Sequence, residues 1–156
     1  MSAPVTMDWF TGPRDELADL FALADDSPEQ VATYRDFGRV LVAREAGAVI
    51  GHLQLVDGER DGEAELKSLA VREDQQGRGV GRMLVERAVE GCRDEGLSTL
   101  LVATAAADTR VLRFYQLLGF RMLRVERDAF TPETGYPEID VDGIPLRDRA
   151  WLSLEL

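Results

Sequence analysis

The residues best suited to chemistry surround a glycine-rich run, Gln76-Gly-Arg-Gly-Val-Gly-Arg82, which follows a strand-like segment from Glu65 to Val71. The three glycines let the backbone approach a ligand closely, and the first amides of a helix that starts here have no partner inside the helix. The helix dipole and the guanidinium groups of Arg78 and Arg82 add attraction for negative charge. The run therefore predicts a site for a phosphate group.

The spacing of the glycines excludes two common phosphate-binding motifs. A dinucleotide fingerprint needs a glycine at the sixth position counted from Gly77, where this chain has Arg82. A P-loop needs a second glycine five residues after the first and then Lys and Ser or Thr, where this chain has Arg82, Met83 and Leu84. Neither a Rossmann dinucleotide site nor a P-loop is expected.

The pattern that fits is Gln-x-x-Gly-x-Gly, present as Gln76, Gly79 and Gly81. With it, the chain resembles the GNAT superfamily of acetyl-coenzyme A dependent N-acetyltransferases, in which this loop holds the pyrophosphate of the coenzyme. A second run, Phe114-Tyr-Gln-Leu-Leu-Gly-Phe120, resembles the other signature of the family. The resemblance spans about residues 62–126 and implies acetyl-CoA as the cosubstrate and an amine as the acceptor.

The resemblance also assigns residues to the coenzyme. In the family, two parallel strands splay apart and the pantetheine lies between them, so open backbone amides along Leu69–Val71 would stabilise the oxyanion. The expected coenzyme contacts are Leu69, Ala70, Val71, Gln76, Gly77, Arg78, Gly79, Val80, Gly81 and Arg82.

Acetyl transfer to an amine needs a base, because a lysine-like alkylamine has a pKa of about 10.4. Glu65 is the first candidate, since a carboxylate can take the proton directly or through a water and since Glu65 resembles the glutamate base of the histone-acetylating branch. Glu63, two residues earlier on the same strand face, is the reserve candidate. Tyr115 stands where the family often has a tyrosine that donates a proton to the coenzyme sulfur.

Other polar residues carry less specific signals. Many relatives have an asparagine that contacts the pantetheine, but this chain has Ala105-Ala-Ala107 there, followed by Asp108, which is expected to cap the next helix. Cys92 lies on an apolar helix stripe and is expected in the core, so direct transfer is favoured over an acetyl-cysteine intermediate. His52 lies on a strand face and is expected to be structural or at the surface.

Composition narrows the class of protein. The 156 residues carry 29 acidic and 18 basic side chains, a net charge of -11, which argues against nucleic acid or an anionic membrane surface as partner and would attract a cation. One cysteine and one histidine make a metal site improbable. The first residues lack the pattern of a secretory leader, so a cytoplasmic protein is expected.

The elements that must position these residues follow from periodicity and turn signals. We expect a helix from about Thr11 to Asp25, a short helix from Ser27 to Tyr34, and a strand hairpin over 40–56 that turns at Gly47. The strand that ends at Val71 leads into a helix from Val80 that stops near Gly96. The remaining expected elements are a strand at 99–103, a helix at 109–118, a strand at 120–125, a long acidic loop at 128–145 and a last strand at 149–154.

A strand, helix and strand around the glycine run imply parallel pairing through a right-handed crossover, whereas the hairpins imply antiparallel neighbours. We therefore expect one α+β domain over 1–156 with the GNAT fold, a mixed and mostly antiparallel sheet that has helices on both faces and a central β-α-β coenzyme unit. The expected activity is acetyl transfer to a primary amine of a cationic small molecule, by direct attack in a ternary complex. The alternatives left open are a protein or peptide amino group as acceptor and a non-catalytic acyl-coenzyme A binding module, and a homodimer is possible.

Overall fold

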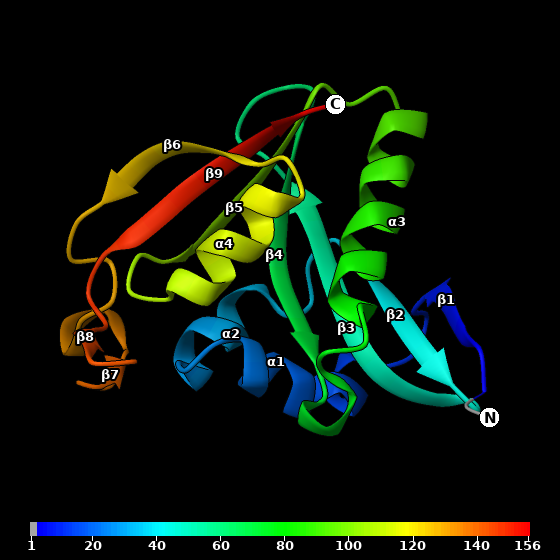
Figure 1. Cartoon of the computed structure of the whole chain (residues 1–156), viewed down its shortest axis with the longest axis horizontal. Coiled ribbons are helices and arrows are strands. Elements are labelled where there is room, and N and C mark those ends of the chain that lie inside the picture. Colours follow the sequence, from blue (N-terminus) through cyan, green and yellow to red (C-terminus); the bar gives the residue numbers. More distant parts are fainter. Residues whose placement is uncertain (1–2) are drawn as a thin grey trace.

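The computed structural model describes residues 3–156 and consists of one large sheet with helices on both sides (Figure 1). The strands of this sheet are Val5–Trp9 (β1), Arg39–Glu45 (β2), Ala48–Asp57 (β3), Glu63–Val71 (β4), Thr99–Ala105 (β5), Arg121–Glu126 (β6) and Arg149–Glu155 (β9). The helices are Ala18–Ala24 (α1), Pro28–Tyr34 (α2), Val80–Asp94 (α3) and Thr109–Leu117 (α4). A two-stranded ribbon, Asp140–Val141 (β7) and Ile144–Pro145 (β8), lies apart from the large sheet.

The strand order of the large sheet is β1-β2-β3-β4-β5-β9-β6. β4 and β5 run parallel, and every other neighbouring pair in this sheet is antiparallel. The parallel pair is joined by α3, which is the crossover that the glycine run and its flanking strands predict. The mixed, mostly antiparallel α+β sheet expected from the sequence is confirmed.

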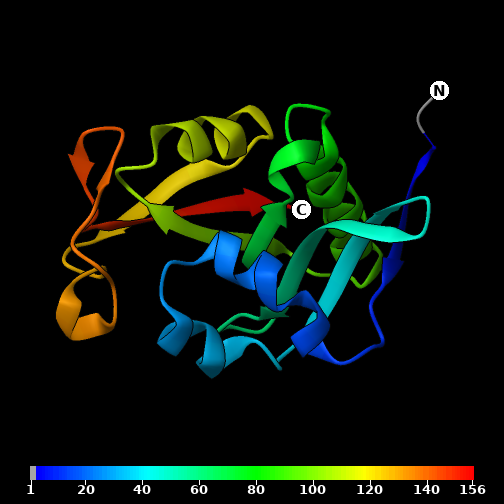
Figure 2. The same ribbon diagram turned by 90° about the horizontal axis from the view of Figure 1, so that it is seen from below.

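Two hydrophobic clusters cover the two faces of the sheet. α3 and α4 pack on one face, where Leu84, Ala88 and Tyr115 belong to the larger cluster. α1 and α2 lie on the other face, where Phe21 and Tyr34 belong to the smaller one. Figure 2 shows the two helix pairs on opposite sides of the strands. The sheet therefore separates two environments, and β4 contributes side chains to both.

Local signals explain several element boundaries. The Ser27 side chain accepts from the Gln30 amide at 3.2 Å, so α2 starts with a polar cap and a proline at its first position. Asp108 caps α4 by accepting from the Val111 amide at 3.2 Å, as expected. The turn between β2 and β3 uses Ala46 and Gly47, both in the left-handed region, which suits a tight hairpin.

The structure differs from the expected elements in two places. The expected helix from Thr11 to Asp25 is split into a 3-10 turn at Arg14–Leu17 and the short α1. The Arg14 guanidinium donates to the carbonyl oxygens of Arg35 and Gly38, at 2.7 and 2.8 Å, and thereby ties this turn to the loop after α2. The local sequence pattern does not predict this contact, because it joins residues that are distant in the sequence.

The second difference concerns the segment expected as a long loop over 128–145. It contains a 3-10 turn at Pro132–Thr134 and the β7–β8 ribbon, and the turn is closed by a capping box between Thr131 and Thr134. The chain then returns as β9, which lies between β5 and β6. Among the helices of residues 3–156, none is long and apolar enough to span a membrane.

Candidate active site

The two parallel strands separate halfway along their length. β4 pairs with β5 only from Glu63–Thr99 to Leu66–Val102. At the same point β4 has a bulge against β3, because Gln54 pairs with Ser68 and Leu55 with Leu66, which leaves Lys67 without a partner in β3. Beyond the bulge, the edge of β4 that faces β5 is open.

The backbone groups on this open edge can be assigned from their alternation along the strand. The Arg72 amide donates to the Ile50 oxygen in β3 at 2.8 Å, so the Ala70 amide also faces β3 and the amides of Leu69 and Val71 face the open edge. The Val71 oxygen lies on the same side and accepts from the Gln76 side chain at 2.9 Å. Two amide donors are therefore available where the strands diverge.

The bulge also changes which face each side chain of β4 occupies. Before it, Ala64 and Leu66 pack against the α3 side, so Glu65 projects to the face of α1 and α2. After it, Leu69 and Val71 pack on the α3 side. The carboxylate of Glu65 therefore lies on the face of α1 and α2, beside the gap that the open amides border from the edge of β4.

A cavity of about 590 Å³ lies between β4 and the start of α3 on one side and α4 on the other. Nine of the ten residues that the sequence assigns to the coenzyme line it, and Arg78 is the exception. Val111, Phe114, Leu117 and Leu118 of α4 form an apolar wall that the sequence did not predict. The cavity thus combines a long apolar side with the glycine loop at its end.

The glycine loop itself is shaped for close approach. Gly77 and Gly79 both have φ near +80°, and a Cβ added at either would meet nothing within 4 Å. Gly79 caps α3 without a side-chain hydrogen bond, and the first amide that donates to a helix carbonyl is that of Met83, to Gly79 at 3.0 Å. The preceding helix amides are free for an anion such as a pyrophosphate.

The two guanidinium groups expected at this loop have carboxylate partners. Arg78 lies 2.6 Å from Glu45, and Arg82 lies 2.6 Å from Glu86 one turn along α3. Arg82 still lines the cavity. The loop amides, rather than free arginines, are the first binding groups available to an anion.

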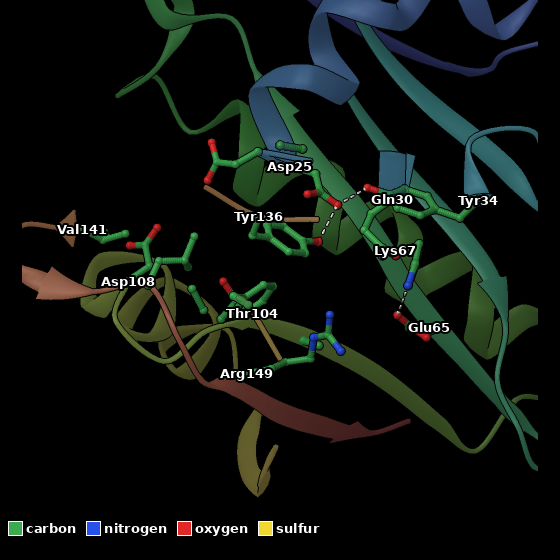
Figure 3. A pocket seen from close by; sticks show the side chains of 16 residues that line it. Asp25, Gln30, Tyr34, Glu65, Lys67, Thr104, Asp108, Tyr136, Val141 and Arg149 are labelled. Carbon is green, nitrogen blue, oxygen red and sulfur yellow. Dashed lines mark hydrogen bonds and ion pairs between the residues drawn. The ribbon is translucent and has the colours of Figure 1, made fainter. Parts of the chain in front are cut away.

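A second cavity, of about 190 Å³, lies on the face of α1 and α2 (Figure 3). Its lining follows β4 through Glu65 and Lys67, whereas the larger cavity continues with Leu69 to Val71, so the two linings succeed one another along the strand. Four carboxylates and two cationic groups face the smaller cavity: Asp25, Asp26, Glu65, Asp108, Lys67 and Arg149. The excess of carboxylates favours a cation.

Glu65 is the carboxylate next to the separating strands. Its side chain is 17% exposed, and its Oε2 lies 3.6 Å from the Lys67 ammonium. Burial raises the pKa of Glu65, and the nearby Lys67 charge opposes part of this rise. Glu63, the reserve candidate, does not line the cavity; its carboxylate accepts from the Arg60 amide at 3.2 Å in the turn before β4. The geometry favours Glu65 of the two.

Asp25 organises the opposite wall, which the sequence did not single out. Its Oδ2 accepts from the hydroxyls of Tyr34 and Tyr136, at 2.7 and 3.3 Å. Burial raises the pKa of both phenols, so both remain proton donors. Figure 3 shows Asp25 joined to the hydroxyls of Tyr34 and Tyr136, with the Tyr34 ring beside Lys67. Tyr136 comes from the segment expected as a loop, where no local pattern marks a packed tyrosine.

That segment contributes apolar rather than acidic groups to the site. Phe130, Tyr136 and Val141 line the cavity, as does Leu146 just after the segment, whereas Glu133, Glu138, Asp140 and Asp142 do not. Asp142 instead lies 3.7 Å from Arg110. The acidic character of the cavity therefore comes mainly from the segment between α1 and α2 and from β4.

Tyr115 lies on α4 and belongs to the larger hydrophobic cluster. It is 4% exposed, and its ring makes edge contacts with Phe114 and Phe120, at centroid distances of 5.1 and 5.4 Å. Burial raises the pKa of its phenol, so the hydroxyl stays protonated. Tyr115 is not among the lining residues of either cavity, and its role as an acid stays a prediction.

The single cysteine and the single histidine of the chain are both buried. Cys92 is fully buried on α3, as expected. His52 is also fully buried, beneath α1, where its Nε2 lies 2.8 Å from the Ser68 hydroxyl and its ring lies 4.5 Å from that of Phe21. In residues 3–156, no group of three His, Cys, Asp or Glu side chains is placed to hold a metal ion.

Comparison with known proteins gives one consistent result. Residues 6–120 match the profile of the Acetyltransferase (GNAT) family. The uncharacterized N-acetyltransferase YvbK of Bacillus subtilis is 34% identical over 144 residues, which cover 92% of this chain and 91% of that protein. The structure of an IAA acetyltransferase from Bacillus cereus has 35% identity and a TM-score of 0.88, and covers 98% of this chain and 100% of its own.

A further solved structure contains the cosubstrate. The GNAT acetyltransferase from Elizabethkingia anophelis, with acetyl-CoA bound, is 27% identical with a TM-score of 0.89, and the match covers 97% of this chain and 98% of that chain. The opening of the sheet beside a glycine loop and these matches agree on the class of acetyl-CoA dependent acyltransferases. The chain belongs to the GNAT family of acetyltransferases, and it is an N-acetyltransferase that uses acetyl-CoA.

Proposed function

We propose that this enzyme acetylates a primary amine of a cationic small molecule, and that the amine reacts in the smaller cavity beside Glu65. The observation that carries the proposal is the position of Glu65 at the strand opening, in a cavity with four carboxylates against two cations. The amine would approach from the face of α1 and α2, and the thioester from the face of α3 and α4. The two would meet at the bulge of β4.

Glu65 would act as the base, directly or through a water. Its raised pKa makes it a better proton acceptor than an exposed carboxylate while it is ionised. The neutral amine then attacks the thioester carbonyl carbon, the new C–N bond forms and the C–S bond breaks. The departing sulfur takes the electron pair and then a proton.

The reaction also needs donors for the oxyanion, a proton for the leaving sulfur and a site for the pyrophosphate. The amides of Leu69 and Val71 face the open edge and can donate to the oxyanion that develops on the carbonyl. Tyr115, which burial keeps protonated, is the proposed donor to the leaving sulfur. The free amides of Gly77 to Arg82 would hold the pyrophosphate at the far end of the coenzyme.

The size of the acceptor cavity favours a small molecule. It measures about 190 Å³ and is closed on one side by Phe130 and Tyr136. The Gln30 side chain donates to the Thr134 oxygen at 3.0 Å and ties this wall to α2. A small alkylamine would suit a cavity of this size, whereas a peptide would extend beyond it.

Coenzyme binding is tested by calorimetry with acetyl-CoA on Gly79→Asp. The new carboxylate would project into the cavity and repel the pyrophosphate, so binding should be abolished. Gly96→Asp is the matched control, because Gly96 also has a left-handed φ and open space at Cβ but lies at the other end of α3. Unchanged binding to Gly79→Asp would refute the assignment of the loop.

The acceptor class and the base are tested by free-thiol release from acetyl-CoA with a panel of amines: 1,4-diaminobutane, an aminoglycoside, neutral amino acids and a short peptide. Cationic small amines should give the highest kcat/KM, and preference for the peptide would contradict the proposal.

With the preferred amine, Glu65→Gln should slow turnover most at low pH, where the amine is mostly protonated and needs a base to remove its proton. A full-rate Glu65→Gln enzyme would exclude Glu65 as the base.

A further inference from the structure

Lys67 is the only lysine among the 156 residues, and all seventeen other basic side chains are arginines. Apart from the amino terminus, the chain therefore contains one primary amine, the functional group on which an N-acetyltransferase acts. That amine does not lie on a remote surface. It lines the cavity in which the external acceptor is proposed to react.

The surroundings of Lys67 resemble those proposed for an acceptor amine. Its Nζ lies 3.6 Å from the Glu65 carboxylate and 4.9 Å from the centre of the Tyr34 ring, so a carboxylate and an aromatic face already hold the ammonium (Figure 3). The side chain is 34% exposed, so part of it is accessible from the cavity.

Its position along β4 places Lys67 close to the strand opening, where the thioester is proposed to lie. Lys67 is the residue without a partner in β3, at the bulge where β4 and β5 separate. Two residues further, the amide of Leu69 faces the open edge. Two residues of a strand span about 6.6 Å, which is comparable to the reach of an extended lysine side chain.

We propose that Lys67 is an internal acetyl acceptor, modified by the acetyl-CoA bound to the same molecule. The inference rests on the proposed function, because it uses the same base and the same opening between the strands. It adds a modification site to the chain and a reaction that needs no external amine.

The chemistry balances with groups already in the site. The ammonium of Lys67 gives one proton to Glu65, and the neutral nitrogen attacks the thioester carbonyl carbon. The C–N bond forms as the C–S bond breaks, and the electron pair leaves with the sulfur. The sulfur takes a proton from Tyr115, which recovers one from the nitrogen. The products are free coenzyme A and acetyl-lysine, and Glu65 returns its proton to solvent.

The experiment is incubation of the full chain with acetyl-CoA alone, followed by intact mass measurement and tryptic mapping. Acetylation adds one acetyl mass and blocks cleavage at Lys67, so that a peptide of residues 61–72 survives intact. Acetylation of the amino terminus appears in a different peptide. Lys67→Arg should lose the modification of residues 61–72.

The control is the uncatalysed acetylation of a surface lysine by acetyl-CoA. The variant Arg93→Lys places such a lysine in the same molecule as Lys67. Arg93 is exposed on the last turn of α3, and the introduced lysine reports the uncatalysed rate. Lys67 should be acetylated at least tenfold faster than that lysine in the folded protein, and at an equal rate in urea. Glu65→Gln should remove the difference.

Equal rates at Lys67 and at the introduced lysine in the folded protein would overturn the proposal. So would an unmodified Lys67 in a protein that turns over an external amine, and in that case the proposed function would stand. The proposed function fails separately, by absence of acetyl-CoA binding or of turnover with every amine of the panel.

Discussion

The side-chain amide of Gln76 donates to the backbone oxygen of Val71 at 2.9 Å. This bond joins the end of β4 to the glycine loop. Val71 has no partner in β5, because the pairing of the two strands ends at Leu66 and Val102. Gln76 therefore occupies one polar group of the open edge, and it fixes the loop relative to the strand that borders the gap.

Replacing Gln76 by leucine should weaken acetyl-CoA binding. A neutral hydrogen bond contributes about 1 kcal/mol, so the dissociation constant should rise about fivefold to tenfold if the bond positions the loop. Calorimetry measures the effect. Gln116→Leu is the control, because Gln116 is exposed on α4 and bonds only to its own helix, to the Leu112 oxygen at 3.2 Å. Equal affinities of the two variants would remove the positioning role of Gln76.

Asp25→Asn should weaken binding of a cationic acceptor without a matching loss of kcat. The substitution keeps an oxygen for the hydroxyls of Tyr34 and Tyr136 but removes one of the four negative charges of the cavity. One charge about 4 Å away contributes about 1 kcal/mol in bulk water and more at the lower dielectric constant of a protein site, so KM should rise at least about fivefold. Steady-state kinetics with the preferred amine measures this change.

The control for that prediction neutralises the acids of the ribbon segment together, with Glu133→Gln, Glu138→Gln, Asp140→Asn and Asp142→Asn. None of these four side chains lines the cavity, so KM should stay within about twofold. If this variant raises KM as much as Asp25→Asn does, binding of the acceptor depends on the overall charge of the protein and not on the carboxylate of Asp25 in the cavity.

The parts of the site that the sequence predicts are those with local signals. The glycine loop has a spacing rule, and Gly79 and Gly81 line the larger cavity. Glu65 was predicted from its resemblance to a glutamate base on the strand that leads into the loop, and the structure places it in the lining of the smaller cavity. The parallel pairing of β4 with β5 followed from the crossover helix between them.

The parts that the sequence missed depend on contacts between distant segments. Asp25 and Tyr136 are 111 positions apart and meet only because β9 returns between β5 and β6. The bulge at Lys67 arises from register against β3 and has no turn residue to mark it. The long acidic loop expected from composition contributes none of its acids Glu133, Glu138, Asp140 and Asp142 to the lining of the cavity.

His52 should make the fold less stable in mild acid. Burial lowers its pKa from 6.5 to about 3, so below pH 6.5 the unfolded chain binds a proton that the folded chain does not. The stability that this group contributes is present above pH 6.5 and is lost as the pH falls toward 3. Urea unfolding at pH 7 and pH 5 should show a loss on the order of 2 kcal/mol from this residue.

His52→Gln is the variant that isolates this contribution. Glutamine can still bond to the Ser68 hydroxyl but does not titrate, so the difference in unfolding free energy between the two pH values should shrink by the same amount. The readout is the pH dependence, which a lower overall stability of the variant does not change. An undiminished pH dependence would show that other groups carry the acid sensitivity.

Cys92 should take no part in acetyl transfer. The thiol is fully buried on the core side of α3, and burial raises its pKa, so little thiolate is present to attack a thioester. Native protein should not react with a thiol reagent that reacts stoichiometrically in urea. Cys92→Ala should keep turnover within about twofold and lose about 1 kcal/mol of stability through the smaller side chain.

Initial-rate kinetics with both substrates varied distinguishes the two mechanisms. Direct transfer in a ternary complex requires intersecting double-reciprocal lines, which we expect. Parallel lines for the unchanged chain, together with loss of turnover in Cys92→Ala, would establish an acetyl-cysteine intermediate.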